Sequence, residues 1–372
     1  MRKPFLLLLA TVAMLLAPLR AETIKVGEFA SLTGKEATYG QAAHKGTVLA
    51  IEEVNSRGGV FGRRLELIAE DDQSKAGEAA TIVKKLVSRD KVVAVLGEIA
   101  SSRSLEATSV CQSTKTPMIS PGSTAPEVTA RGNYIFRACF IDSFQGTVMA
   151  KFAARSLKAK RVAVLSSVTS AESVGLSKYF REEFTRQGGA VALEQRYSDG
   201  DKDFHAQLTA IRAAQVDGIF VPGYYAEAAL ICKQARELGI TAPIFGIDGW
   251  ESSQLVAIGG AAVEGCYFDT HFSPENSSAS VKAFNERYKA RWDEPSDTLA
   301  ALGYDSVMML VDAIKRAGTT ESTKLRNALA ATKDLQAVTG TITLDERRNP
   351  TKSAVVLQVK NGQFHFVESI EP

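Results

Sequence analysis

The chain has 372 residues, 45% of them apolar and 23% charged, and a formal net charge of +2 at pH 7. Residues 1–21 hold three of the basic residues and no acids, which leaves a nearly neutral remainder. This balance argues against a nucleic-acid partner, which would require a basic face. The length fits two domains, and the apolar content is sufficient for a core in each.

The first 21 residues have the layout of a secretory signal peptide. Arg2 and Lys3 give a positive start, and an apolar run over residues 5–16 follows, interrupted only by Thr11. This pattern predicts cleavage after Ala21 and export to the periplasm. The run is too short to cross a bilayer comfortably, because a spanning helix needs about 20 apolar residues. No cysteine at the cleavage point offers a lipid anchor.

From residue 22 onward, short apolar strands alternate with amphipathic helices in two runs. In the first run we expect strands at 24–29, 65–70, 92–96 and 117–119, with helices at 39–57, about 79–86 and from about 102. In the second run we expect helices at 146–157, from 173, from 204 and at about 228–238, with strands at 162–165, near 191, at 218–221 and at 244–247. Such alternation predicts an α/β fold of two doubly wound lobes, whose parallel sheets carry helices on both faces.

The last third has a different pattern. We expect helices at 279–292, 298–317 and 321–331, followed by strands at 340–344, 353–359 and 364–367. Asn361-Gly362, between the last two strands, is a strong signal for a tight hairpin turn.

The sequence offers little that suggests catalysis, a metal or a cofactor. It lacks His-Glu-x-x-His, Gly-x-Ser-x-Gly and phosphate-loop motifs, so we expect a protein that is not an enzyme. The histidines lie far apart at His44, His205, His271 and His365. The cysteines are Cys111, Cys139, Cys232 and Cys266. Their spacing matches no metal knuckle or redox pair, which leaves buried thiols or one disulfide as the alternatives.

Two turns of the first run follow strand ends with small and hydroxyl residues. Ser101 lies in the turn after the strand at 92–96, and Gly122, Ser123 and Thr124 follow the strand at 117–119. Open α/β sheets bind ligands at the carboxyl ends of their strands. Free backbone N–H groups, a helix dipole and hydroxyl donors suit a small anion such as a carboxylate. The alternative is ordinary N-capping by serine and threonine.

The second run offers the opposite chemistry at equivalent places. Tyr224 and Tyr225 follow the strand at 218–221, while Asp248 and Trp250 follow the strand at 244–247. An acid can pair with an ammonium group, and aromatic faces add cation–π attraction. The alternative is that Asp248 caps a helix and the aromatic rings pack in a core.

A series of short motifs, taken in order, matches a known family. They are residues 24–27 and 32–34, Tyr39-Gly40, Asn55, Gly58-Gly59, Asp71-Asp72, residues 119–127 and Phe136-Arg137. The chain thereby resembles the type I periplasmic binding proteins of the leucine/isoleucine/valine-binding branch. The resemblance implies two lobes joined by three crossover segments. The N-terminal lobe would comprise residues 22–141 plus 270–344, and the C-terminal lobe 142–269 plus 345–372.

The resemblance also implies a role and a site. The expected role is the periplasmic component of an ABC-type import system, a monomer that binds a branched-chain or related amino acid between the lobes and docks on an inner-membrane permease. Ser101, Gly122 and Thr124 fall where the family binds the ligand carboxylate and part of the ammonium. Tyr39 falls where an aromatic flanks the ligand. Tyr224 matches a closing-lobe tyrosine, and Asp248 matches the acid that pairs with the ammonium.

The sequence leaves three alternatives open. Glu172 stands where the family has a tyrosine, so it favours a polar or cationic ligand side chain if it faces the cleft, and has no such effect if it points to solvent. The same fold also serves other small carboxylates or amides, such as aromatic acids or GABA. A sensor that presents its ligand to a receptor is a further alternative.

Overall fold

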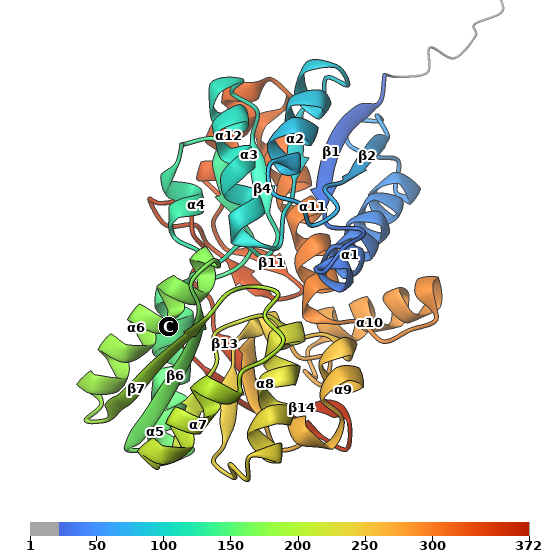
Figure 1. The fold of residues 1–372 in the computed structure, drawn as a ribbon. Coiled ribbons are helices and arrows are strands. Elements are labelled where there is room, and N and C mark those ends of the chain that lie inside the picture. Colours follow the sequence, from blue (N-terminus) through green and yellow to red (C-terminus); the bar gives the residue numbers. More distant parts are fainter. Residues whose placement is uncertain (1–21, 372) are drawn as a thin grey trace, which may run out of the picture.

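Two sheets, one parallel and one largely parallel, form the upper and lower halves of the molecule, and each sheet is covered by helices (Figure 1). The computed structural model describes residues 22–371, so the predicted signal peptide lies outside the described residues. No helix within this range is both long enough and apolar enough to cross a bilayer. The α/β fold with two doubly wound lobes, predicted from the alternation of strands and helices, is confirmed.

The first sheet has the order β2-β1-β3-β4-β5, with all strands parallel. Its strands are β1 (Ile24–Ala30), β2 (Leu65–Asp71), β3 (Ala94–Leu96), β4 (Met118–Ser120) and β5 (Ile135–Arg137). The helices of this lobe are α1 (Ala37–Ser56), α2 (Glu78–Ser88), α3 (Ser101–Ser113), α4 (Glu127–Ala130), α10 (Ala279–Trp292), α11 (Thr298–Ala317) and α12 (Ser322–Ala330). Ala94 and Leu96 pack toward α1 and α11, while Val95 packs toward α2 and α3, which explains why β3 is apolar throughout.

The second sheet repeats this order as β7-β6-β8-β9-β10 and adds two antiparallel strands, β13 and β14, beside β10. Its strands are β6 (Arg161–Ser167), β7 (Ala190–Tyr197), β8 (Gly218–Phe220), β9 (Ile244–Gly246), β10 (Tyr267–Thr270), β13 (Ala354–Lys360) and β14 (Gln363–Ile370). Its helices are α5 (Asp142–Arg155), α6 (Ala171–Arg186), α7 (His205–Ala214), α8 (Tyr225–Glu237) and α9 (Ser253–Gly259), with short 3-10 turns at Asp248–Trp250 and Gly260–Val263. The predicted hairpin turn is present: Asn361 and Gly362 both have positive φ.

The chain passes between the two sheets after β5, after β10, and between the small ribbon of β11 (Leu335–Ala337) and β12 (Gly340–Ile342) and strand β13. Thr270 still pairs with β13 of the second sheet. Arg348 donates to the carbonyls of Ile135 and Thr129, and Asn349 bonds Thr129, all on the first lobe. We therefore propose that the second crossing follows Thr270 and that the third comes at about residues 351–353, later than the sequence suggested.

All four cysteines are buried free thiols. Cys232 and Cys266 lie near each other, with 3.8 Å between their sulfur atoms. Of the two alternatives that the sequence left open, the structure has the buried thiols.

Candidate ligand-binding site

The carboxyl ends of the strands in the two sheets face each other, and the predicted site residues lie there. Ser101 and Thr124 follow β3 and β4 of the first sheet. Glu172, Tyr224 and Asp248 follow β6, β8 and β9 of the second. A hydrogen bond from Thr124 Oγ1 to Glu172 Oε1, 3.3 Å long, joins the two sets directly. The structure thus brings together residues that are far apart in sequence.

Hydrogen bonds fix the shape of the two loops of the first lobe. The Glu98 carbonyl accepts bonds from the hydroxyls of Ser120 at 2.7 Å and Ser123 at 2.8 Å. The Ser123 amide donates to Ser120 Oγ at 2.8 Å. Since both polar groups of Ser123 already have partners within the lobe, we propose that Ser123 holds the loop in shape, in place of the predicted ligand contact.

Ser101 and the start of α3 provide donors for an anion. Ser101 Oγ accepts a bond from the Ala125 amide at 3.1 Å, which ties the two loops together and leaves the hydroxyl proton available. Ala100 is the N-cap of α3 and makes no side-chain cap, so the alternative of ordinary capping does not apply at this terminus. The first-turn N–H groups of a helix have no acceptor within the helix. The hydroxyl and these amides are therefore suited to a carboxylate.

Gly122 allows the close approach of the two loops. A Cβ atom at this position would come within 2.9 Å of the Ile99 side chain. A larger residue would force the Ile99 side chain to shift. Gly122 therefore leaves room for Ile99 between the two loops.

Asp248 is a buried acid that neutral groups hold in place. Gln145 Nε2 donates to Oδ1 at 2.8 Å, and His271 Nε2 lies 3.0 Å from Oδ2. Burial lowers the pKa of His271 to about 4, so this histidine is neutral at pH 7 and donates its N–H to Asp248. Asp248 opens a 3-10 turn without capping it, which argues against the capping alternative. The carboxylate of Asp248 is thus held in one orientation by neutral groups, which do not neutralise its charge.

Sequence reasoning did not find Gln145 and His271. Gln145 lies in α5, and His271 directly follows β10 at a crossing between the lobes. Neither belongs to a motif, and His271 was an isolated histidine in the sequence. Only the fold places them beside Asp248.

Three tyrosines close one side of the site. The Tyr39 ring, from α1 of the first lobe, makes edge contacts with Tyr224 at 5.6 Å and Tyr225 at 5.1 Å between ring centroids. The Tyr39 hydroxyl donates to the Gly249 carbonyl and accepts a bond from the Tyr225 amide at 3.3 Å. We call this contact the tyrosine bridge. It joins the lobes without any ligand atom.

Glu172 points into the site, which resolves the alternative that it faces solvent. It is 5% exposed and lies in the first turn of α6. Burial raises the pKa of Glu172 well above its usual value, and the nearby negative charges of Asp248 and Asp142 add to this effect.

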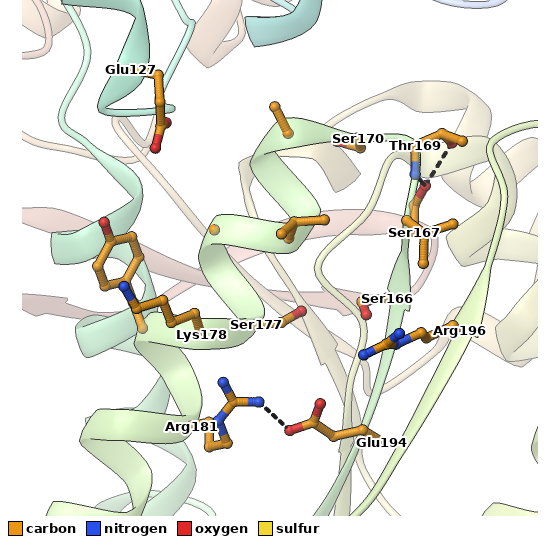
Figure 2. A pocket seen from close by; sticks show the side chains of 15 residues that line it. Glu127, Ser166, Ser167, Thr169, Ser170, Ser177, Lys178, Arg181, Glu194 and Arg196 are labelled. Atoms are coloured by element: carbon orange, nitrogen blue, oxygen red, sulfur yellow. Dashed lines mark hydrogen bonds and ion pairs between the residues drawn. The ribbon is translucent and has the colours of Figure 1, made fainter. Parts of the chain in front are cut away.

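A separate cavity of about 800 Å³ is lined by α6, by parts of β6 and β7 and by Glu127 of the first lobe. Figure 2 shows Glu127 of α4 above it, Lys178 beside it, and Arg181 of α6 turned toward Glu194 of β7. None of the eight residues predicted for the site lines this cavity. The predicted residues therefore mark a different place, between the lobes.

Comparison with known proteins identifies the family. A family model described as "Periplasmic binding protein" matches residues 23–363. The chain belongs to the periplasmic binding protein family. A leucine-, isoleucine-, valine-, threonine- and alanine-binding protein of Pseudomonas aeruginosa is 33% identical over 328 residues, which cover 88% of this chain and 87% of the relative.

Solved structures of periplasmic binding proteins share the whole fold. A leucine-binding protein of Thermotoga maritima is 39% identical with a TM-score of 0.90, covering 94% of this chain and 99% of that one. A branched-chain amino acid transporter substrate-binding protein of Streptococcus pneumoniae, solved in complex with isoleucine, is 36% identical with a TM-score of 0.89, covering 94% and 100%. The resemblance to the leucine/isoleucine/valine-binding branch is thereby confirmed.

Proposed function

We propose that this protein is the periplasmic substrate-binding component of an ABC-type amino-acid importer and that it holds the amino acid between its lobes. One observation carries the proposal: the donors at Ser101 and α3 and the oriented carboxylate of Asp248 meet across the same interface. An amino acid has a carboxylate and an ammonium on one carbon. Its carboxylate can therefore bind the donors of the first lobe while its ammonium binds Asp248 of the second. The named relatives bind amino acids, which supports the same class of ligand here.

Binding favours the closed arrangement because Asp248 gains a cationic partner only when the lobes meet. A ligand shifts a conformational equilibrium by its difference in affinity for the two states. In the closed state the site residues are buried, except for Tyr224, which is partly buried. Removal of water strengthens the charge contacts between protein and ligand. The closed protein then presents its ligand to the permease.

The remaining features fit this role. Export follows from the leader pattern of residues 1–21, and the protein acts as a monomer that binds without catalysing a reaction. An aromatic acid would fill the donor side but would leave Asp248 without a cation. For this reason the site favours an amino acid over the other small carboxylates that the fold accommodates.

A calorimetric titration of residues 22–372 tests the function. The ligands are the common amino acids, each compared with its α-amide and with the matching acid that lacks the amino group. We expect at least one amino acid to bind, and both of its truncated analogues to bind far more weakly, because each leaves one buried partner unsatisfied. Tight binding of benzoate or GABA, with no response to any amino acid, would contradict the proposal.

A further inference from the structure

Four buried carboxylates lie on the second-lobe side of the interface. The α-ammonium of an amino acid can pair with only one of them. They are Asp142, Glu172, Asp248 and Asp269, each between 0% and 7% exposed. Asp248 receives bonds from Gln145 and His271, and Gln145 also reaches Asp269 at 3.3 Å. Among the residues that the structure describes, neither oxygen of Asp142 has a hydrogen-bond partner. A buried carboxylate without a partner is costly, and burial raises the pKa of Asp142 to about 8, so Asp142 is mostly protonated at pH 7 until a donor reaches it.

The protein itself provides little positive charge here. The guanidinium of Arg137 donates to the carbonyls of Ser123 at 2.6 Å and Ala125 at 2.8 Å, and its charge offsets only part of the effect of burial on the pKa of Asp142. Lys352 donates to Thr339, and His271 is neutral. Within the described part of the chain, no group of three or more acids, histidines or cysteines is arranged to hold a metal ion. A hydrogen-bond donor on an organic ligand would supply the acids with a further partner.

Glu172 is well placed to meet such a donor. Its hydrogen bond from Thr124, at 3.3 Å, is long, and the Tyr224 hydroxyl is its other neighbouring donor, which leaves acceptor positions of the carboxyl group for a ligand. Thr124 lies in the loop that offers donors to the ligand. A ligand held between Ser101 and Asp248 therefore has Glu172 beside it.

Hydrogen bonds hold the backbone at the start of α6, which carries Glu172. Ser170 caps α6 by accepting a bond from the Ser173 amide at 3.2 Å, and Ser173 Oγ accepts a bond from the Ser167 amide at 2.9 Å. A Cβ atom added at Gly175 would lie 2.9 Å from Asp142 Oδ2, so the beginning of α6 lies directly against Asp142. The backbone that carries Glu172 is thus held in position by contacts within the protein.

We infer that Glu172, with Asp142 behind it, makes this protein select amino acids whose side chain donates a hydrogen bond over aliphatic amino acids of the same shape. The inference rests on the proposed function and names its substrate class. An aliphatic side chain would exclude water from Glu172 and give it no donor in exchange. A hydroxyl, amide or ammonium group would supply one.

Pairs of similar-sized amino acids test this selection in the wild-type protein. Threonine is compared with valine, asparagine with leucine, and lysine with norleucine, by calorimetric titration. In at least one pair we expect the donor-bearing member to bind at least about tenfold more tightly, since sites built to bond a polar group discriminate strongly against its apolar analogue. Glu172→Met should abolish that preference. Glu172→Gln keeps an acceptor, so it should retain a preference for neutral donors and lose one for a cationic donor.

The control is Glu182→Gln, which removes a carboxylate from an exposed position on the same helix and should leave all affinities unchanged. If each aliphatic member binds as tightly as its partner, and Glu172→Met leaves the ratios unchanged, the inference is wrong while the proposed function stands. If no amino acid binds the wild-type protein, the proposed function itself is wrong. Should circular dichroism show that Glu172→Met does not fold, the wild-type ratios and Glu172→Gln decide the question.

Discussion

The two lobes have the same strand order but present opposite chemistry to the ligand. The first sheet runs β2-β1-β3-β4-β5, and the parallel part of the second repeats it as β7-β6-β8-β9-β10. At the ends of the first set stand hydroxyls and free amides, and at the ends of the second stand carboxylates and tyrosines. The shared topology thus sets where the loops lie, whereas loop composition sets which end of a zwitterion each lobe accepts.

The two lobes also differ in how their site groups are held. In the first lobe, the carbonyl of Glu98 accepts hydrogen bonds from the hydroxyls of Ser120 and Ser123. In the second, Asp248 depends on donors from α5 and from the crossing after β10. The donor loops are therefore organised locally, while the acid is organised by distant segments. Substitutions on the two sides should have different consequences.

The largest effect is expected on the acidic side. Asp248→Ala should weaken amino-acid binding by about 3–5 kcal/mol, because the ligand ammonium would be buried without its charged partner. Calorimetric titration measures the change. The control is Asp312→Ala on α11, where the carboxylate makes only a surface pair with Arg316 and should not alter binding. An affinity within about threefold of wild type would remove Asp248 from the site.

A smaller effect is expected on the donor side. Ser101→Ala removes one donor to the ligand carboxylate and should cost about 1–3 kcal/mol of binding free energy. The loss should be seen for the amino acid and be much smaller for its α-amide, whose interaction at this end is already impaired. Ser113→Ala, at the exposed far end of α3, is the matched control. Equal losses for acid and amide would show that Ser101 does not face the carboxylate.

The support of Asp248 predicts a pH effect on stability. His271 has a folded pKa of about 4, below its usual value near 6.5. The unfolded chain therefore binds this proton first as the pH falls, and stability is complete above about pH 6.5 and declines below it. In urea unfolding at pH 7.5 and pH 5, wild type should lose roughly 1–2 kcal/mol more than His271→Gln. Parallel losses in both proteins would show that His271 is not buried in its neutral form.

The smallest effect is expected at the tyrosine bridge. Tyr39→Phe keeps the ring but removes the hydroxyl that joins Gly249 and Tyr225, which should cost the closed state about 1 kcal/mol. The apparent Kd should rise about fivefold, and small-angle scattering should show a larger radius of gyration for the ligand-free protein. Tyr134→Phe, whose hydroxyl bonds Thr323 within the first lobe, should change neither quantity.

Sequence patterns predicted the longer elements well and missed several short ones. Helices such as α2 and α11 carry an apolar stripe that reveals them. Strand β5 has three residues and α4 has four. Elements this short do not show the periodic apolar pattern of a strand or a helix. Strand β10 and helix α9 were also not predicted. Their position becomes clear only from their pairing and packing in the second lobe.

The position of the candidate-site residues in the fold was predictable where one local rule applied. Ser101, Thr124 and Asp248 stand directly after strands, and the carboxyl ends of parallel strands share one edge of a sheet. Asp142 and His271 come from crossing segments, whose path through space no local pattern reveals. Ser123 follows the same local rule, but the rule does not give the direction of its side chain. A hydroxyl in such a loop has the same sequence signature whether it faces the ligand or its own lobe.

The tyrosine bridge has a consequence for transport efficiency. Because this contact needs no cargo, part of the free energy of closure is available to the empty protein. In the proposed transport role, a fraction of empty molecules would therefore adopt the shape that a permease recognises, and each such encounter would occupy the membrane complex without delivering anything. The strength of a few interlobe hydrogen bonds therefore sets an upper limit on how well the importer distinguishes loaded carriers from idle ones.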